Sequence, residues 1–323
     1  MDNVKKFLSK AFSKKMIILY VAIVLVTVLV YQIGTSIALC NMVVGDVSFP
    51  QSAVGKDLVK GEFATSGNKA WLDSVSVDEY IEKSDGHKLH ALRVNNEHST
   101  HSYIIIYHPV SLTSADMADY AYHFADIGFN VLMPDLRGCG ESDYTDISFG
   151  VTDTEDIILW INKIIEEDAE ATIFLFGVGS GGTAVLTTCD ETLPENVKGI
   201  IEDSGYDSLK DVFKNNIEKY YNKKSFPSLL IADIYVESKY GWSISDVSIS
   251  DQVHHSTVPI LFIHGGADEI VPVSHSNDMY EVCPAIGSKH LLINSADHCR
   301  SMYADSERYW SEVDEFIVGK MGE

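Results

Sequence analysis

The sequence predicts an α/β protein with a mostly parallel, doubly wound sheet, a leading antiparallel hairpin, a helical cap and one N-terminal transmembrane helix. Three observations predict this fold. A long apolar run lies near the N-terminus, short apolar runs alternate with amphipathic stretches of helix length after residue 95, and residues 206–257 break that alternation. Short runs that are apolar on both faces are typical of parallel strands buried beneath two layers of helices.

The N-terminal apolar run predicts a membrane anchor. It begins at Met16, and no charged residue occurs between there and Gly45. Roughly 20 apolar residues cross the core of a bilayer, so residues 16–44 are expected to span it. Two alternatives remain, a signal peptide cleaved near Ala38 and a buried core helix. Residues 1–15 hold five lysines and one acidic residue, so the positive-inside rule predicts a cytoplasmic tail and an extracellular C-terminal domain.

The remaining elements follow in chain order. Residues 45–70 are polar and lack periodicity, so they are expected to link the anchor to a domain at 71–323. Two alternating runs, one from Asp73 onward and one at 88–94, are separated by the turn Ser84-Asp85-Gly86-His87 and predict the hairpin. The expected parallel strands are 103–107, 129–133, 172–176, 198–201, 259–263 and 290–293. The expected helices are 114–127, 152–167, 180–189, 274–283 and 305–318, with the cap helices at 207–221, 226–240 and 244–253.

Charge and cysteine content exclude several classes of protein. The chain has 24 basic and 47 acidic residues, a formal net charge of −23, and therefore lacks the basic face that nucleic-acid binding requires. Since the N-terminal tail is basic, the acid lies in the domain, where it would disfavour contact with anionic lipid. The five cysteines show no metal-ligand spacing, so neither a metal nor a cofactor is expected. The sequence leaves the oligomeric state open.

Three loops at the ends of predicted strands carry residues suited to nucleophilic catalysis. The first is the turn Gly177-Val178-Gly179-Ser180-Gly181, the second contains Asp268 and the third contains His298. A hydroxyl nucleophile needs an imidazole to take its proton, and that imidazole needs a carboxylate to hold its tautomer. These loops, together with Asp135-Leu136-Arg137-Gly138-Cys139-Gly140-Glu141-Ser142, resemble those of the α/β-hydrolase superfamily, and within it the membrane-anchored bacterial serine-hydrolase-like proteins (serine aminopeptidases and esterases).

The resemblance implies that Asp268 is the catalytic acid and His298 the base, but it fails at the nucleophile. In the G-x-S-x-G turn of this family the residues two before and two after the serine are small. Gly177 and Gly181 fit that frame, and Gly179 occupies the serine position. Glycine adopts the strained backbone of this turn at little cost. Two interpretations of Ser180 stay open: a displaced nucleophile, or only the first residue of the following helix.

The expected oxyanion-binding groups are backbone amides. After the third strand the sequence reads His108-Pro109-Val110, and the position of the first donor falls on Val110. The second donor would be the amide of Ser180. Asp203, which follows another strand, is an alternative acid.

Two functions remain open from the sequence. The first, implied by the resemblance, is hydrolysis of a small-molecule carboxylic ester or amide outside the membrane, with Ser180, His298 and Asp268 as the catalytic residues. The second is a non-catalytic pseudoenzyme that binds a ligand or a protein partner at the cell surface. Serine catalysis requires Ser180 Oγ within roughly 2.6–3.2 Å of His298 Nε2. The rotation of the turn at residues 179–180 therefore decides between them.

Overall fold

The computed structural model of the chain describes residues 14–43, 61–98, 100–110, 112–144, 146–222 and 224–321. Most of the predicted cytoplasmic tail at 1–15 and most of the predicted linker at 45–70 lie outside these residues. Within the linker range, Phe63 and Ala64 are buried and helix α3 (Ser66–Val75) has formed. The folded part thus begins before residue 71, because α3 packs against helix α4 (Ala118–Asp126).

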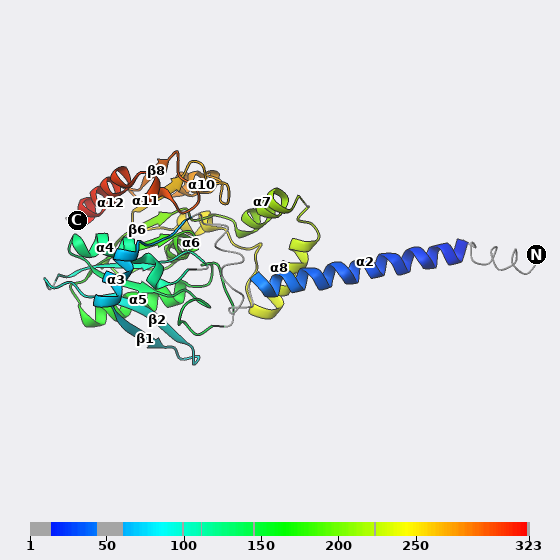
Figure 1. Cartoon of the computed structure of the whole chain (residues 1–323), viewed down its shortest axis with the longest axis horizontal. Coiled ribbons are helices and arrows are strands. Elements are labelled where there is room, and N and C mark those ends of the chain that lie inside the picture. Colours follow the sequence, from blue (N-terminus) through cyan, green and yellow to red (C-terminus); the bar gives the residue numbers. More distant parts are fainter. Residues whose placement is uncertain are drawn as a thin grey trace, which may run out of the picture.

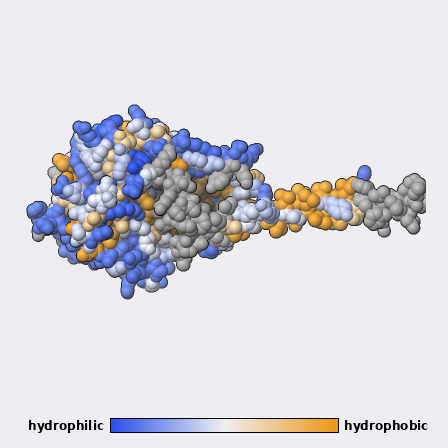
Figure 2. Space-filling view, viewed as in Figure 1, coloured by the Kyte–Doolittle hydropathy of each residue, from blue (hydrophilic) through white to orange (hydrophobic). Residues whose placement is uncertain are grey.

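The predicted anchor is a single helix, α2 (Lys14–Val43), that projects from the rest of the molecule (Figure 1). Residues Lys14–Ala38 are long and apolar enough to cross a membrane, and none of the most apolar window is buried against the protein. Figure 2 shows this exposed helix as a hydrophobic rod beside a largely hydrophilic body.

The centre of the domain is an eight-stranded sheet with the order β1-β2-β4-β3-β5-β6-β7-β8. The first two strands form the predicted antiparallel hairpin, and β2 is also antiparallel to β4, whereas all later pairs are parallel. The predicted fold class is therefore confirmed. The strands are β1 (Val77–Glu82), β2 (Lys88–Val94), β3 (Ser102–Tyr107), β4 (Asn130–Pro134), β5 (Thr172–Val178), β6 (Val197–Asp203), β7 (Ile260–Gly265) and β8 (Lys289–Ile293).

Helices cover both faces of the sheet, and alternate residues of each central strand point to one face or the other. In β3, Ile104 and Ile106 pack with α4 and α12 (Ser306–Met321), whereas Ile105 packs on the opposite face with α5 (Thr154–Glu167). This arrangement explains why the strands are solidly apolar. The other helices on this frame are η1 (Ser114–Met117), α6 (Ser180–Thr187), η2 (Thr188–Asp190), α9 (Ile249–Val253), α10 (Ser274–Val282) and α11 (Ser301–Ala304).

The interval between β6 and β7 contains three helices, as predicted, but only two of them form a separate cap. Ile249 and Val253 of α9 belong to the main core beside α6. The cap consists of α7 (Leu209–Tyr221) and α8 (Ser228–Tyr240), which share a smaller apolar cluster with the end of α2. A second difference concerns residues 73–75, expected in a strand, which end helix α3 instead because Leu72 is buried by helical packing.

Candidate active site

The predicted site residues come from loops at the carboxyl ends of β3, β5, β7 and β8. Parallel strands end at the same edge of a sheet, so these loops meet although they are distant in sequence. Asp268 follows β7 and His298 follows β8, and the two side chains are joined by a hydrogen bond of 2.7 Å between His298 Nδ1 and Asp268 Oδ2. Val110 follows β3, and its amide lies 2.5 Å from the hydroxyl oxygen of Ser180, which follows β5.

The carboxylate of Asp268 is fully buried and held at both oxygens. Oδ1 accepts hydrogen bonds of 2.8 Å from the backbone amides of Ile270 and Val271. Burial alone would raise the pKa of Asp268, but the neighbouring charge of His298 and the hydrogen bond from His264 lower it well below its usual value. Asp268 is therefore ionised at neutral pH and fixed in orientation.

His298 can act as a base in this geometry. Its Nδ1 bonds to Asp268, so in the neutral imidazole Nδ1 carries the proton and Nε2 has a free lone pair. In the described part of the chain no protein group hydrogen-bonds to Nε2. The His298 side chain as a whole is 12% exposed.

Gly179 forms the turn between β5 and α6 in a conformation that favours glycine. Its φ is 58° and its ψ is −122°, its N–H donates to the Asp203 carbonyl, and its own carbonyl accepts from Thr183. A Cβ at this position would lie 2.9 Å from Cys299 Sγ and 3.3 Å from Pro109 Cβ. Both the backbone and the surrounding atoms therefore disfavour a side chain at residue 179.

The two flanking glycines explain why the turn is so tight. A Cβ on Gly177 would lie 2.1 Å from the Gly181 carbonyl oxygen, and a Cβ on Gly181 would lie 2.3 Å from the Tyr107 carbonyl oxygen. These are backbone contacts that no side-chain rotation relieves. The sequence frame G-x-G-x-G thus fixes α6 close against β5 and β3.

Ser180 is the first residue of α6, and its hydroxyl is hydrogen-bonded to the loop after β3. The side chain is nearly buried, and Oγ accepts the hydrogen bond from the Val110 amide. Within the described residues no hydrogen bond joins Ser180 to His298. The structure thus brings His298 together with Asp268, and Ser180 together with Val110, but it does not assemble a Ser180–His298 pair.

Cys299 lies against this turn and was not among the residues predicted for the site. It is fully buried, and its φ of 55° is in the left-handed region, which turns its thiol toward the space above Gly179. Burial raises the pKa of the Cys299 thiol well above its usual value, so the thiol is neutral and a poor nucleophile.

A second buried acidic group lies behind the site. Glu202 Oε2 accepts from the Gly205 amide at 2.8 Å, whereas Oε1 has no hydrogen-bond partner. Burial raises the pKa of Glu202 to about 8. The alternative acid, Asp203, accepts hydrogen bonds from Ser204 and Ser301, whereas the carboxylate that bonds to His298 is that of Asp268. Among the described residues, no cluster of His, Cys, Asp or Glu suits a metal ion.

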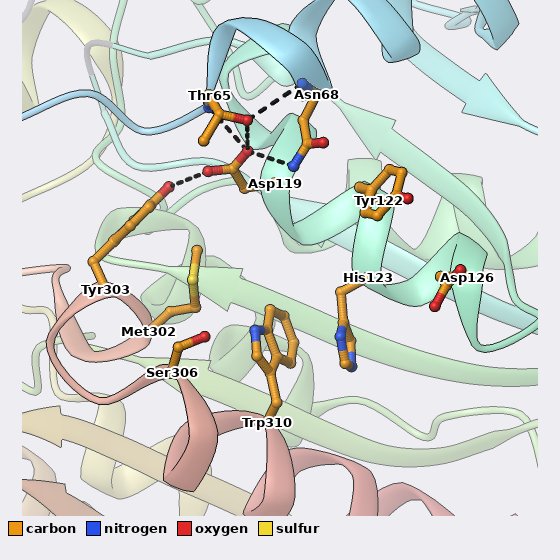
Figure 3. A pocket seen from close by; sticks show the side chains of 10 residues that line it. All are labelled: Thr65, Asn68, Asp119, Tyr122, His123, Asp126, Met302, Tyr303, Ser306 and Trp310. Carbon is orange, nitrogen blue, oxygen red and sulfur yellow. Dashed lines mark hydrogen bonds between the residues drawn. The ribbon is translucent and has the colours of Figure 1, made fainter.

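A separate surface pocket of about 390 Å³ lies between α3, α4 and the C-terminal helices (Figure 3). The Asp119 carboxylate in this pocket already accepts hydrogen bonds from Thr65, Asn68 and Tyr303. Gly179, Ser180, Val110, Asp268 and His298 do not line this pocket. The pocket is therefore distinct from the Asp268–His298 site.

Comparison with known proteins agrees with this architecture. The family described as serine aminopeptidase, S33, matches residues 98–233, which include the turn at Gly179 but not Asp268 or His298. The chain is 26% identical over 226 residues to the protein YqkD of Bacillus subtilis, covering 68% of this chain and 72% of YqkD. It is 23% identical to the membrane protein YNL320W of Saccharomyces cerevisiae, covering 72% of this chain and 76% of that protein.

A solved structure shows the same fold. The esterase Pf2001 of Pyrococcus furiosus superposes with a TM-score of 0.63 at 20% identity, over 81% of this chain and 98% of the esterase. The sheet topology and these matches show that the chain has the α/β-hydrolase fold.

Proposed function

We propose that the chain is a membrane-tethered α/β-hydrolase-fold protein that binds a small carbonyl compound at the Asp268–His298 site and forms no serine acyl-enzyme. One observation carries this proposal: Ser180 Oγ accepts the Val110 amide hydrogen bond, while Gly179 stands at the turn where the superfamily places its nucleophile. The Ser180 hydroxyl thus accepts the hydrogen bond of the Val110 N–H, which was expected to donate to the oxyanion. Gly179 has no side chain that could attack a substrate.

The same contacts suggest how a ligand would be held. Because Ser180 Oγ accepts from Val110, its O–H remains free to donate to a ligand carbonyl oxygen. His298 Nε2, supported by Asp268, can accept from a ligand hydroxyl or amide N–H. A primary or secondary amide offers both groups, and an ester offers the carbonyl oxygen, which is consistent with the esterase among the solved structures of this fold.

The test is covalent labelling of the full-length chain by a fluorophosphonate, which reacts with activated serines. We expect no labelling of the wild type and no difference in Ser180→Ala. An active serine hydrolase treated in the same way serves as the positive control. Labelling of the wild type that is lost in Ser180→Ala would overturn the proposal.

A second candidate is hydrolysis by direct attack of water, and the ordered Asp268–His298 pair favours it. His298 Nε2 would take a proton from a water molecule as its oxygen attacks the carbonyl carbon, and would return that proton to the leaving alkoxide. This route requires no nucleophile at residue 179. Steady turnover of 4-nitrophenyl butyrate that is abolished in His298→Ala, without fluorophosphonate labelling, would support it over simple binding.

The tether is the second part of the proposal. It is supported by the span Lys14–Ala38, by the lysines that precede it, and by the relative named as a membrane protein. The expected topology has the N-terminus in the cytoplasm and the domain outside. Protease added to intact cells should digest a C-terminal tag, and the mass of the recovered chain should show that α2 is retained. A tag protected from protease, or a chain that begins after Ala38, would contradict this topology.

A further inference from the structure

The end of the anchor helix is part of the cap. Ser36 and Cys40 of α2 are buried, and Cys40 Sγ contacts the carbonyl of Ala232 in α8 at 3.9 Å. Cys40 belongs to the same apolar cluster as Leu229 and Val236 of α8. Figure 1 accordingly shows α7 and α8 on the side of the domain from which α2 projects.

This contact sets the height of the cap above the bilayer. The candidate span ends at Ala38, two residues before Cys40. At roughly 1.5 Å of rise per residue, the contact with α8 lies within one helical turn of the membrane boundary. The cap is therefore the part of the domain held at the membrane surface.

The outward face of the cap is apolar. Phe226, Leu230 and Ile234 are exposed by 71%, 49% and 59%, and they recur every four residues along α8 and the turn before it. Leu229 and Val236, which lie on a neighbouring face of the helix, are buried. Tyr220 at the end of α7 is also exposed, by 51%. Within the described residues no protein element covers this apolar stripe.

The cap is also the basic part of an acidic domain. Residues 209–240 contain six lysines against four acidic residues, whereas the whole chain has a net charge of −23. Lys214 and Lys224 are exposed, and Lys219 pairs with Glu269 at the surface. Lysines beside an exposed apolar stripe are typical of helices that lie in the interface of an anionic membrane.

We propose that the α7–α8 cap rests on the bilayer surface, with Phe226, Leu230 and Ile234 inserted among the lipids and the cap lysines at anionic headgroups. This proposal rests on the membrane tether proposed above, since α2 holds the cap at the boundary. The local charge of the cap reverses the expectation, based on net charge, that the domain avoids anionic lipid.

The test uses the full-length chain in phospholipid vesicles. Cys283 is replaced by Ser, because it is the one cysteine that is not fully buried, and a fluorophore sensitive to polarity is attached to Ile234→Cys. Ile286→Cys is the matched control, since Ile286 is an exposed apolar residue outside the cap, at 95% exposure. Spin-labelled lipids should quench the probe at residue 234 severalfold more than the probe at residue 286.

The charge contribution is measured in the same system. Quenching at residue 234 should be greater in vesicles that contain phosphatidylglycerol than in phosphatidylcholine alone, and Lys214→Glu with Lys224→Glu should remove the difference. Equal and weak quenching at both positions, in chains that float with the vesicles, would overturn the cap proposal. Chains that fail to float would instead refute the tether. If the emission of the probe at residue 234 is blue-shifted but not quenched, and the shift grows with the protein-to-lipid ratio, the stripe contacts a second copy of the chain. This result would also overturn the proposal.

Discussion

At the scale of single residues, Gly179 and Cys299 share one small space. The thiol of Cys299 lies where a side chain on residue 179 would begin, and the positive φ of Gly179 adds a backbone cost for any other residue. The backbone conformation of residue 179 and the neighbouring Cys299 side chain therefore both disfavour a serine at this position. Restoring a nucleophile requires two changes rather than one.

The double variant Gly179→Ser/Cys299→Ala is expected to react with fluorophosphonate more than Gly179→Ser alone, because removal of the thiol relieves the 2.9 Å contact. The single serine variant should lose about 2 kcal/mol of unfolding free energy through its strained backbone and the contact. Labelling kinetics and chemical denaturation measure the two effects. Cys299→Ala alone, which should not label, is the control; equal labelling of the single and double variants would contradict the shared-space argument.

Glu202 gives a prediction for pH dependence. Its folded pKa is raised to about 8, so between the unfolded value of 4.5 and this value the folded chain binds the extra proton. Stability is therefore present below the unfolded pKa and falls as the pH rises toward 8, by at most about 1.4 kcal/mol per pH unit. Glu202→Gln should flatten this slope, as measured by denaturation at several pH values. Glu195→Gln, at an exposed carboxylate, should leave it unchanged; an unaltered slope in Glu202→Gln would refute the assignment.

At the scale of elements, the turn between β5 and α6 depends on how closely the helix approaches the strands. The sequence predicts this turn from the spacing of Gly177, Gly179 and Gly181, because only small residues fit at these positions. The direction in which Ser180 points could not be assigned, since it depends on where the loop after β3 places the Val110 amide. A contact between loops 70 residues apart has no local sequence signal.

Gly181→Ala tests this close approach. The new methyl would lie 2.3 Å from the Tyr107 carbonyl oxygen, so α6 must move away from β3, at a cost of about 3 kcal/mol or more. Thermal unfolding should show a correspondingly lower midpoint. Gly67→Ala, in helix α3 with open space around its Cβ, should change the midpoint little or raise it. Similar midpoints for the two variants would show that the turn tolerates a wider separation.

At the scale of the whole molecule, the cap connects the anchor to the domain. The sequence indicated a cap and an anchor as separate features, and the structure joins them through Cys40 and α8. The net charge predicts poor contact with anionic lipid, whereas the proposal for the cap rests on local charge, because net charge averages an acidic domain with a basic cap. What a membrane encounters is the local charge within a Debye length of about 8 Å.

Cys40→Lys should separate α2 from the cap, because it places an ammonium group in a buried contact next to Lys239. Amide hydrogen exchange of α8 in the full-length chain should then become faster, while exchange in the central strands stays the same. Cys40→Ser, which keeps the size of the side chain, is the matched control. Unchanged exchange in α8 would show that the cap is stable without the anchor.

The sequence by itself determined the fold class, the long apolar helix near the N-terminus, and Asp268 and His298 as a candidate acid–base pair. These follow from local periodicity and from loops that parallel strands must bring to one edge of the sheet. The tertiary structure alone decided that Ser180 faces Val110, that Cys299 fills the space above Gly179, and that α2 packs on the cap. Each of these is a contact between segments far apart in the chain, where side-chain direction depends on packing rather than on neighbouring residues.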